Sequence, residues 1–468
     1  MAPGPWSTLR SMESRVSLPT ESVPSEPLTA LNPLLGTMQW TVPLFGPRRW
    51  WSGPLDVEGL ALASVRAAAT AATALAGEPL GLEVDAAHVF GAFGSIDFLR
   101  VDGRRPAGFA PLSGFFPTGE GWIRLHANYP HHEAALLRAL SVTGEDQLRD
   151  ALHRISARGA EKAIRAGGGI AAAVRPPDDW RQSGPGRAVD AADWIDLTLP
   201  TDTTTHRRAG LEGLRVLDLT RVIAGPTATQ VLALLGAEVL RLDPPHLPEL
   251  PDQHLDRDAG KRTTVADLRA PATLARVRAL LTEADLLITS YRPGALTRFG
   301  LNWDAVHADF PHLVMVELNA WGRTGPWGQD RGFDSIVQAA TGIAHLYGEQ
   351  AEDGAWAPGA LPVQALDHAT GYGAAAAALA LLHRRNTTAA AGHAHLSLAR
   401  TAHLLLDLPQ SPSGPATAPT PVLQTTSTPG ALLRHTAPPV TRLGASLVYP
   451  HGPLAYGSSP LQWMSSPE

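Results

Sequence analysis

The stretch that decides the fold is LRVLDLTRVIAGPTATQVLALLGAEVLRLDPP, residues 214–245. Its apolar run Leu214–Leu219 predicts a buried parallel strand, and Ala224-Gly225-Pro226 predicts a turn. Thr227 is a plausible N-cap for the helix that follows, and Glu238–Leu242 predicts the next strand. A strand, a turn, a helix and a second strand packed this closely are typical of a nucleotide-binding unit.

Two common phosphate-binding motifs do not occur in the chain. The turn does not read Gly-x-Gly-x-x-Gly, and no Gly-x-x-x-x-Gly-Lys-Ser/Thr is present anywhere in the sequence. The sequence therefore supports neither an ordinary dinucleotide-binding fold nor a P-loop.

Composition is typical of an intracellular enzyme. The 468 residues suffice for two domains with substantial cores. A net charge of -6 gives no general reason to bind nucleic acid or an anionic membrane. The absence of cysteine excludes disulfides, thiolate metal sites and a cysteine nucleophile. The N-terminus lacks an apolar signal region, and the apolar run Gly373–Leu382 is too short to span a bilayer. We therefore expect a cytoplasmic protein without nucleic-acid or membrane partners.

Five further motifs follow the opening unit in order. They are GKRTTVADLRAP at 260–271, DLLITSYRPGALTRFGL at 285–301, LVMVELNAWGRTGPW at 313–327, GFDSIVQAATGIAHLYG at 332–348 and LPVQALDHATGYGAAAAALALLHRR at 361–385. Together with the opening unit they resemble the class III CoA-transferase family, which includes formyl-CoA and carnitine CoA-transferases and α-methylacyl-CoA racemases. The resemblance implies an α/β fold, with a Rossmann-like parallel sheet in a large domain and a smaller α+β domain.

The chain divides into four parts. Residues 1–30 are rich in Pro, Ser and Glu and predict a disordered leader. Residues 31–205 form a partial repeat that contains a small-domain-like region, and 206–405 form the CoA-binding domain with the catalytic aspartate. Residues 406–468 predict a Pro/Ser/Thr-rich linker and tail, with a possible strand near Leu447.

The two halves of the chain resemble each other in part. Leu55-Asp56 and Leu366-Asp367 each precede an alanine-rich helix, and residues 82–90 fall opposite 394–405. Residues 114–140 resemble the start of the family's small domain, yet they precede the nucleotide-binding unit. The chain thus resembles a rearranged or partly duplicated family member.

Asp367 is the candidate catalytic residue. It lies between the apolar run Leu361–Leu366 and a long helix, where helical N–H groups can stabilise a carboxylate. The resemblance implies that it attacks the acyl-CoA thioester and forms a covalent aspartyl intermediate. The alternative is an aspartate that only caps the helix. Asp56, its repeat counterpart, has no nucleotide-binding unit before it and is expected to be such a cap.

Cations are expected to hold the phosphates of CoA. Lys261 and Arg262 lie in a loop ahead of a strand, whereas Arg292 and Arg298 bracket the turn after the strand Leu286–Ser290. The resemblance places CoA contacts at Ile223, Ala224, Ser290, Tyr291 and Arg298. We expect the phosphates near Arg298 and the Lys261–Arg262 pair. Solvated surface arginines are the alternative.

Phe333 favours transfer over racemisation. It occupies the position where similar racemases carry a histidine, and phenylalanine cannot accept a proton. A histidine could enter from elsewhere in the fold. His126, His131 and His132 cluster in the sequence without a metal-binding spacing, so we interpret them as packing or surface histidines and expect no metal.

The sequence predicts a homodimeric CoA-transferase that moves CoA from an acyl-CoA to a carboxylic acid acceptor. CoA and acyl-CoA are substrates, and no permanently bound cofactor is expected. Two alternatives stay open. One is an acyl-CoA racemase, isomerase or lyase that uses Asp367 as a base, and the other is a non-catalytic CoA-binding member of the family.

Overall fold

A seven-stranded sheet is the centre of the computed structural model, which describes residues 16–19, 22–36, 40–203, 210–350, 354–409 and 416–464. The strand order is β11-β10-β9-β12-β13-β16-β8. Every neighbouring pair is parallel except β16 and β8. The strands are β8 (Asp196–Thr198), β9 (Arg215–Leu219), β10 (Glu238–Asp243), β11 (Arg262–Val265), β12 (Leu286–Thr289), β13 (Val314–Asn319) and β16 (His393–Ser397).

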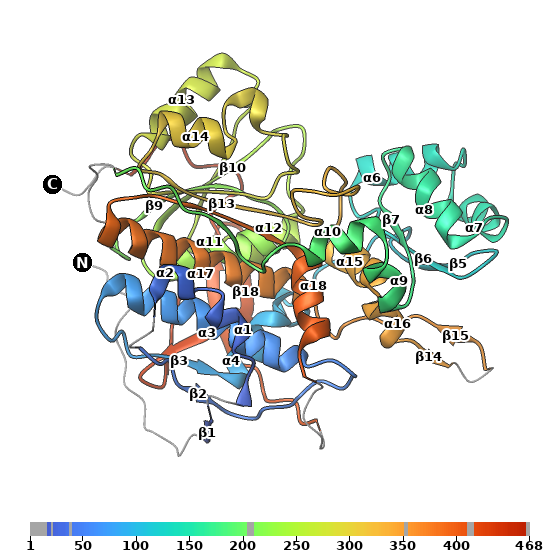
Figure 1. Cartoon of the computed structure of the whole chain (residues 1–468), viewed down its shortest axis with the longest axis horizontal. Coiled ribbons are helices and arrows are strands. Elements are labelled where there is room, and N and C mark those ends of the chain that lie inside the picture. Colours follow the sequence, from blue (N-terminus) through green and yellow to red (C-terminus); the bar gives the residue numbers. More distant parts are fainter. Residues whose placement is uncertain are drawn as a thin grey trace.

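Helices cover both faces of this sheet (Figure 1). Strands such as β12, which is Leu-Leu-Ile-Thr, are buried along their whole length, as parallel strands between helical layers must be. Connecting helices are α11 (Ala224–Leu234), α12 (Pro251–Arg257), α13 (Pro271–Leu281), η2 (Thr297–Phe299), α14 (Trp303–Asp309), α15 (Asp334–Thr341), α16 (Ile343–Leu346) and α17 (Ala365–Thr388). The six parallel strands have the doubly wound order, and the order reverses between β9 and β12. The predicted α/β class is confirmed, and the reversal marks the crevice where such sheets bind ligands.

The opening unit differs from its prediction at one point. Ala224-Gly225-Pro226 forms the first turn of α11 and is not a separate turn, because proline fits the start of a helix. Thr227 is therefore inside the helix, where its hydroxyl accepts a hydrogen bond from Arg257 (3.1 Å). A Cβ on Gly225 would come 2.3 Å from Cβ of Thr220, so only glycine allows α11 to start this close to the preceding loop.

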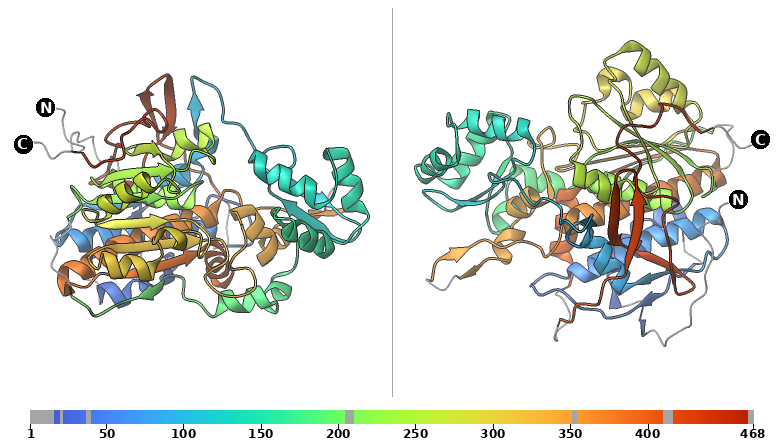
Figure 2. Two further views of the ribbon diagram at one scale, coloured as in Figure 1. Left: turned by 90° about the horizontal axis from the view of Figure 1, so that it is seen from above. Right: turned by 180° about the vertical axis from the view of Figure 1, so that it is seen from behind.

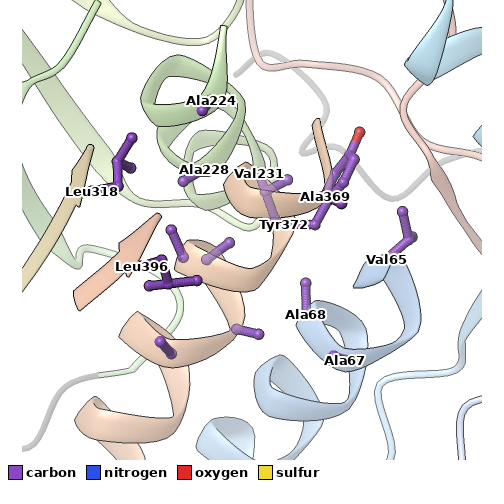
Figure 3. Packing of buried hydrophobic residues seen from close by; sticks show 14 of the residues in the cluster. Val65, Ala67, Ala68, Ala224, Ala228, Val231, Leu318, Ala369, Tyr372 and Leu396 are labelled. Carbon is purple, nitrogen blue, oxygen red and sulfur yellow. The ribbon is translucent and has the colours of Figure 1, made fainter. Parts of the chain in front are cut away.

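Two long alanine-rich helices form the middle of the core. α3 (Val57–Ala76) packs along α17, and α17 crosses α11 (Figure 3). In the described part of the chain α3 is the one helix long and apolar enough to cross a membrane, but 94% of that stretch is buried inside the protein. Burial on all sides is typical of a core helix.

The two halves repeat the same order of elements. α3 is followed by β3 (Leu82–Asp85) and α4 (Ala86–Phe93), and α17 is followed by β16 and α18 (Leu398–Asp407). β3 belongs to a second sheet with the order β1-β2-β3-β19-β20. The front half also contains β1 (Ser17–Leu18), α1 (Glu26–Thr29), α2 (Asn32–Leu35), β2 (Leu44–Phe45), α5 (Ser95–Phe98) and β4 (Arg100–Val101).

A smaller α+β unit stands to one side of the main body (Figure 2). Its antiparallel sheet and helices enclose a separate hydrophobic core. The elements are β5 (Gly114–Pro117), β6 (Trp122–Leu125), α6 (Pro130–Ala139), α7 (Glu145–His153), α8 (Ala157–Ala166) and β7 (Ala171–Ala173). Helices α9 (Pro177–Arg181) and α10 (Gly184–Asp190) lead from it to β8, and the hairpin β14 (Glu349–Gln350) and β15 (Trp356–Ala357) follows α16. Helix α15 packs against β6 and β7, so this unit adjoins the sheet's ligand-binding edge.

Both ends of the chain are more structured than predicted. Residues 22–30 contain α1 and the buried Val23, so the prediction of a disordered leader is wrong there; residues 1–15 lie outside the described residues. Residues 416–464 form β17 (Leu423–Thr428), β18 (Ala431–Thr436), β19 (Val440–Arg442) and β20 (Ala445–Ser446). Because β18 pairs with β4 and β19 pairs with β3, this segment is part of the core architecture and not a linker.

Candidate active site

A cavity of about 290 Å³ opens where the strand order reverses. Its walls come from the loops after β9 and β12, the start of α17, the segment before α15 and the small unit. Five of the nine predicted site residues line it together: Ala224, Ser290, Tyr291, Arg292 and Asp367. The loops at the carboxyl ends of two adjacent strands thus meet the start of a helix that lies far away in the sequence.

The loop after β9 is held in a strained conformation. Val222 has a φ of 70°, which is unfavourable for a β-branched residue. Its N–H donates to Glu249 (2.9 Å), and the N–H of Arg221 donates to the hydroxyl of Ser290 (3.0 Å). Ser290 therefore fixes the loop that lines the cavity, and the neighbouring Tyr291 lines the same cavity.

Asp367 is buried in the first turn of α17, with 7% of its surface exposed. Burial, reinforced by the negative charge of Asp334, raises its pKa well above the ordinary value. The N-cap position is Gln364, and no side chain caps this helix, so the interpretation of Asp367 as a helix cap is wrong. A desolvated carboxyl group that faces a cavity is a candidate nucleophile or base.

Asp56 has the structural role that Asp367 lacks. Its carboxylate accepts a hydrogen bond from the N–H of Gly59 (3.0 Å) and pairs with Arg48 (2.9 Å), so it caps α3 as expected.

Asp334, at the start of α15, was missed by the sequence reasoning. One of its oxygens accepts hydrogen bonds from the N–H groups of Leu366 (2.9 Å) and Asp367 (3.1 Å), and the other accepts one from the Gln338 amide. Burial raises the pKa of Asp334 to about 6. Asp334 thus anchors the turn that carries Asp367. The sequence signal for Asp334 is its position directly after Phe333 in the motif GFDSIVQAATG.

Histidines of the small unit gather around Phe333. The ring of His126 stacks on Phe333 with centroids 3.7 Å apart, and His132, which lines the cavity, meets Phe333 edge-on at 5.6 Å. Burial lowers the pKa of both histidines to about 3, so both are neutral. The fold therefore places the imidazole of His132 in the cavity of Asp367, which the sequence did not predict. Within the described ranges no group of three or more His, Asp or Glu could hold a metal ion.

Two arginines give the cavity a positive wall. Arg292 donates to the carbonyl of Gln329 (3.1 Å) and Arg331 to that of Gly168 (3.4 Å), and neither has a carboxylate partner among the residues that the structure describes. Partial burial and the charge of Arg292 lower the pKa of Arg331. Two unneutralised guanidinium groups facing one cavity fit a phosphate or carboxylate ligand. Arg331 was not predicted, because a lone arginine between motifs carries no distinctive pattern.

The predicted phosphate contacts of Lys261 and Arg262 are wrong. Lys261 is fully buried, and its ammonium group donates to the carbonyl of Pro226 (2.9 Å) and lies 3.4 Å from Asp258. Arg262 pairs with Glu238 (2.9 Å). Both residues stand at the amino end of β11, whereas parallel sheets bind ligands at the carboxyl ends of their strands.

Two other predicted residues lie outside the cavity lining. Ile223 is the N-cap of α11, next to the lining residue Ala224. Arg298 lies in η2 and is exposed, with its guanidinium over the ring of Phe299 (4.6 Å). Contacts between these two residues and a longer part of CoA stay predictions.

The fold and the cavity define a doubly wound α/β protein with a buried carboxyl group at its ligand-binding edge. Residues 211–427 match the model of CoA-transferase family III.

Similar proteins share the same segment. The chain is 33% identical to a succinate–glutarate CoA-transferase of Agrobacterium fabrum, over 31% of this chain and 40% of that protein. It is 34% identical to the probable fatty acyl-CoA transferase Rv3272 of Mycobacterium tuberculosis, over 39% of this chain and 48% of that protein. A crystal structure of Rv3272 aligns with a TM-score of 0.38 at 30% identity, over 42% of this chain and 57% of that chain. The chain thus spans less than half the length of these two curated relatives.

Proposed function

We propose that the protein transfers CoA from an acyl-CoA to a carboxylic acid, with Asp367 as the covalent nucleophile. The observation that carries the proposal is the buried carboxyl group of Asp367, in one cavity with the unneutralised cations Arg292 and Arg331. Relatives named as CoA-transferases support the same chemistry.

The proposed reaction proceeds through two kinds of acyl intermediate on Asp367. The carboxylate attacks the thioester carbonyl, the C–S bond breaks, and CoA thiolate leaves an acyl–aspartyl anhydride. The thiolate then attacks the aspartyl carbonyl, which releases the donor acid and forms an aspartyl-CoA thioester. An acceptor carboxylate repeats these two steps in reverse and leaves with CoA. No net proton is gained or lost.

The surrounding residues have distinct parts in this proposal. The carboxylate of Asp334 holds the backbone of Asp367 in place, and its negative charge makes ionised Asp367 more basic and more nucleophilic. Arg292 and Arg331 attract an anionic group of CoA or the acceptor acid. In this proposal CoA is a substrate, the protein has no permanently bound cofactor, and it acts in the cytoplasm, where it forms a homodimer with one complete site in each chain.

Proton exchange at the α-carbon of an acyl-CoA is the second candidate. The observation that favours it is His132, a neutral imidazole that lines the cavity of Asp367 and could act as a second base. It would compensate for the phenylalanine at position 333.

Mass spectrometry of reaction mixtures tests both proposals. Succinyl-CoA, acetyl-CoA or a branched acyl-CoA is incubated in deuterated water, with and without glutarate or another acid. New acyl-CoA that forms only with the acceptor supports transfer. Deuterium at the α-carbon without an acceptor supports the second candidate. Binding of CoA without either change would contradict both and support a non-catalytic role.

A further inference from the structure

A second cavity of about 290 Å³ shares no lining residue with the first. Parts of the front half, α11, α12, α17 and the C-terminal segment form its walls. Tyr372 of α17 contributes to it, five residues after Asp367 and therefore roughly 140° around the helix from it. The second cavity thus lies on a different face of the helix that carries the candidate nucleophile.

Two tyrosine hydroxyls in this cavity have no hydrogen-bond partner within the described residues. Tyr372 is 3% exposed, and its hydroxyl extends beyond the aliphatic side chains of the core (Figure 3). Tyr449, from the segment after β20, lines the same cavity. Burial raises the pKa of both tyrosines, so both remain protonated donors. Both residues line the cavity, so an acceptor atom of a ligand there can bond to their hydroxyls.

The charged groups in the wall neutralise each other. The guanidinium of Arg257 pairs with Asp256 (2.6 Å), and the hydroxyl of Ser95 also donates to Asp256 (2.8 Å). The described lining therefore holds no unpaired carboxylate, lysine or arginine, and its two histidines, His435 and His451, lie within hydrogen-bond distance of the carbonyls of Thr436 and Gly452.

An acceptor group faces the same space. The side-chain nitrogen of Gln230 donates to the carbonyl of Asp256 (3.1 Å), which leaves its oxygen without a donor in the described part of the chain. Apolar residues, among them Leu255 and Leu433, complete the lining. The cavity therefore combines donors, an acceptor and apolar walls without net charge.

We propose that this cavity is a second binding site, for a small uncharged amide with an apolar body. The carbonyl oxygen of such a ligand would accept from Tyr372 and Tyr449, and its N–H would donate to Gln230. The site is separate from the acyl-CoA cavity, and the inference does not depend on the proposed transfer reaction.

Benzamide and benzoate are suitable probes, because they have nearly the same shape and differ in charge and in the N–H donor. Calorimetry or ligand-observed NMR should detect benzamide binding to the full chain, with benzoate at least about tenfold weaker. The double variant Tyr372→Phe/Tyr449→Phe should lose about tenfold in benzamide affinity. Tyr291→Phe, in the acyl-CoA cavity, is the matched control and should bind benzamide as wild type does.

Thermal unfolding of the ligand-free proteins separates a binding role from a structural one. The double variant should unfold at the wild-type temperature, because neither hydroxyl bonds another group within the described residues. A lower unfolding temperature would assign the hydroxyls a structural role and overturn the proposal. Failure of wild type to bind benzamide, equal binding of benzoate, or undiminished affinity in the double variant would also overturn it.

Discussion

The two buried carboxyl groups of Asp334 and Asp367 determine the chemistry of the cavity. Asp334 accepts the N–H of Asp367 and raises its pKa. The hydrogen bond from the N–H of Asp367 to Asp334 positions the nucleophile. The negative charge of Asp334 makes ionisation of Asp367 less favourable. A carboxylate with a raised pKa is a better nucleophile once ionised, but a smaller fraction of it is ionised at low pH.

Replacement of Asp334 by Asn should shift the pH profile of turnover. Asparagine keeps an oxygen that can accept from the two N–H groups, yet it removes the negative charge beside Asp367. The pKa of Asp367 should fall, and the acidic limb of the kcat profile should move to lower pH. Steady-state rates between pH 5 and 8, measured for wild type and variant, check this. An unmoved acidic limb would show that Asp334 does not act on Asp367 electrostatically.

Wild type should also lose stability as pH rises through the pKa of Asp334. The folded-state pKa of about 6 lies above the value in an unfolded chain, so the folded state holds this proton more tightly. The stabilisation is complete below the unfolded pKa and is lost between roughly pH 4 and 6, by about 1–3 kcal/mol. Denaturant unfolding should show a smaller decline in Asp334→Asn than in wild type, because the raised pKa of Asp367 contributes to the decline in both proteins. The same decline in both proteins would assign it to other groups.

The positive wall predicts where CoA binding is sensitive to charge. Arg331→Ala should weaken binding of CoA by about 1–3 kcal/mol, because it removes a charge-assisted contact. Arg262→Ala is the matched control and should bind as wild type does, since Arg262 pairs with Glu238 away from the cavity. Titration calorimetry gives both affinities. Loss of binding in the control alone would place the phosphates at the other edge of the sheet.

Sequence reasoning found the residues whose roles follow from their place along a strand or helix. Ser290 and Arg292 follow β12, and Asp367 starts a long helix, so their approximate positions were predictable. Lys261 was misplaced because its buried partners, such as Asp258, come together only in the folded sheet. His132 was missed as a cavity residue because nothing in a single sequence shows that the small unit folds over this edge.

At the scale of helices and strands, the crossing of α11 and α17 determines the geometry of the cavity. A Cβ on Gly371 would lie 2.4 Å from the carbonyl oxygen of Ala224, a cavity-lining residue. The helices can therefore approach this closely only because position 371 has no side chain.

Gly371→Ala should consequently separate the two helices. We expect a loss of about 1–3 kcal/mol in the free energy of unfolding, together with reduced turnover, because Asp367 and Ala224 move apart. Gly108→Ala is the matched control, since no atom lies within 4 Å of the added Cβ. Denaturant unfolding and steady-state rates check both variants. Equal stability of the two variants would show that the crossing tolerates a side chain.

Periodicity predicted most strands of the sheet and the long helices, whereas the boundaries depended on local packing. β9 and β10 agree with prediction to within one residue at each end. The start of α11 was misplaced because Gly225 and Pro226 usually indicate turns. Here the close approach to Thr220 and the fixed φ of proline begin a helix instead.

The whole molecule builds its candidate site from both halves of one chain. The small unit precedes the sheet in the sequence, yet Tyr129 and His132 line the same cavity as Asp367. The hydroxyl of Tyr129 donates to Glu249 (2.6 Å), which also holds Val222. A direct hydrogen bond thus links the small unit to the loop after β9.

A site completed within one chain should not require a second copy. The turnover rate per chain should therefore stay constant on dilution, including concentrations at which sedimentation shows a monomer. A rate that falls in parallel with dissociation would mean that a partner subunit contributes to the site, as the predicted homodimer allows.

Covalent trapping tests the central claim, that Asp367 is the nucleophile, most directly. The protein is incubated with an acyl-CoA that it turns over, treated with hydroxylamine and mapped by peptide mass spectrometry. The account predicts a hydroxamate on the peptide that contains Asp367, and neither label nor turnover in Asp367→Ala. A label on the peptide that contains Asp56, or undiminished turnover in Asp367→Ala, would contradict it.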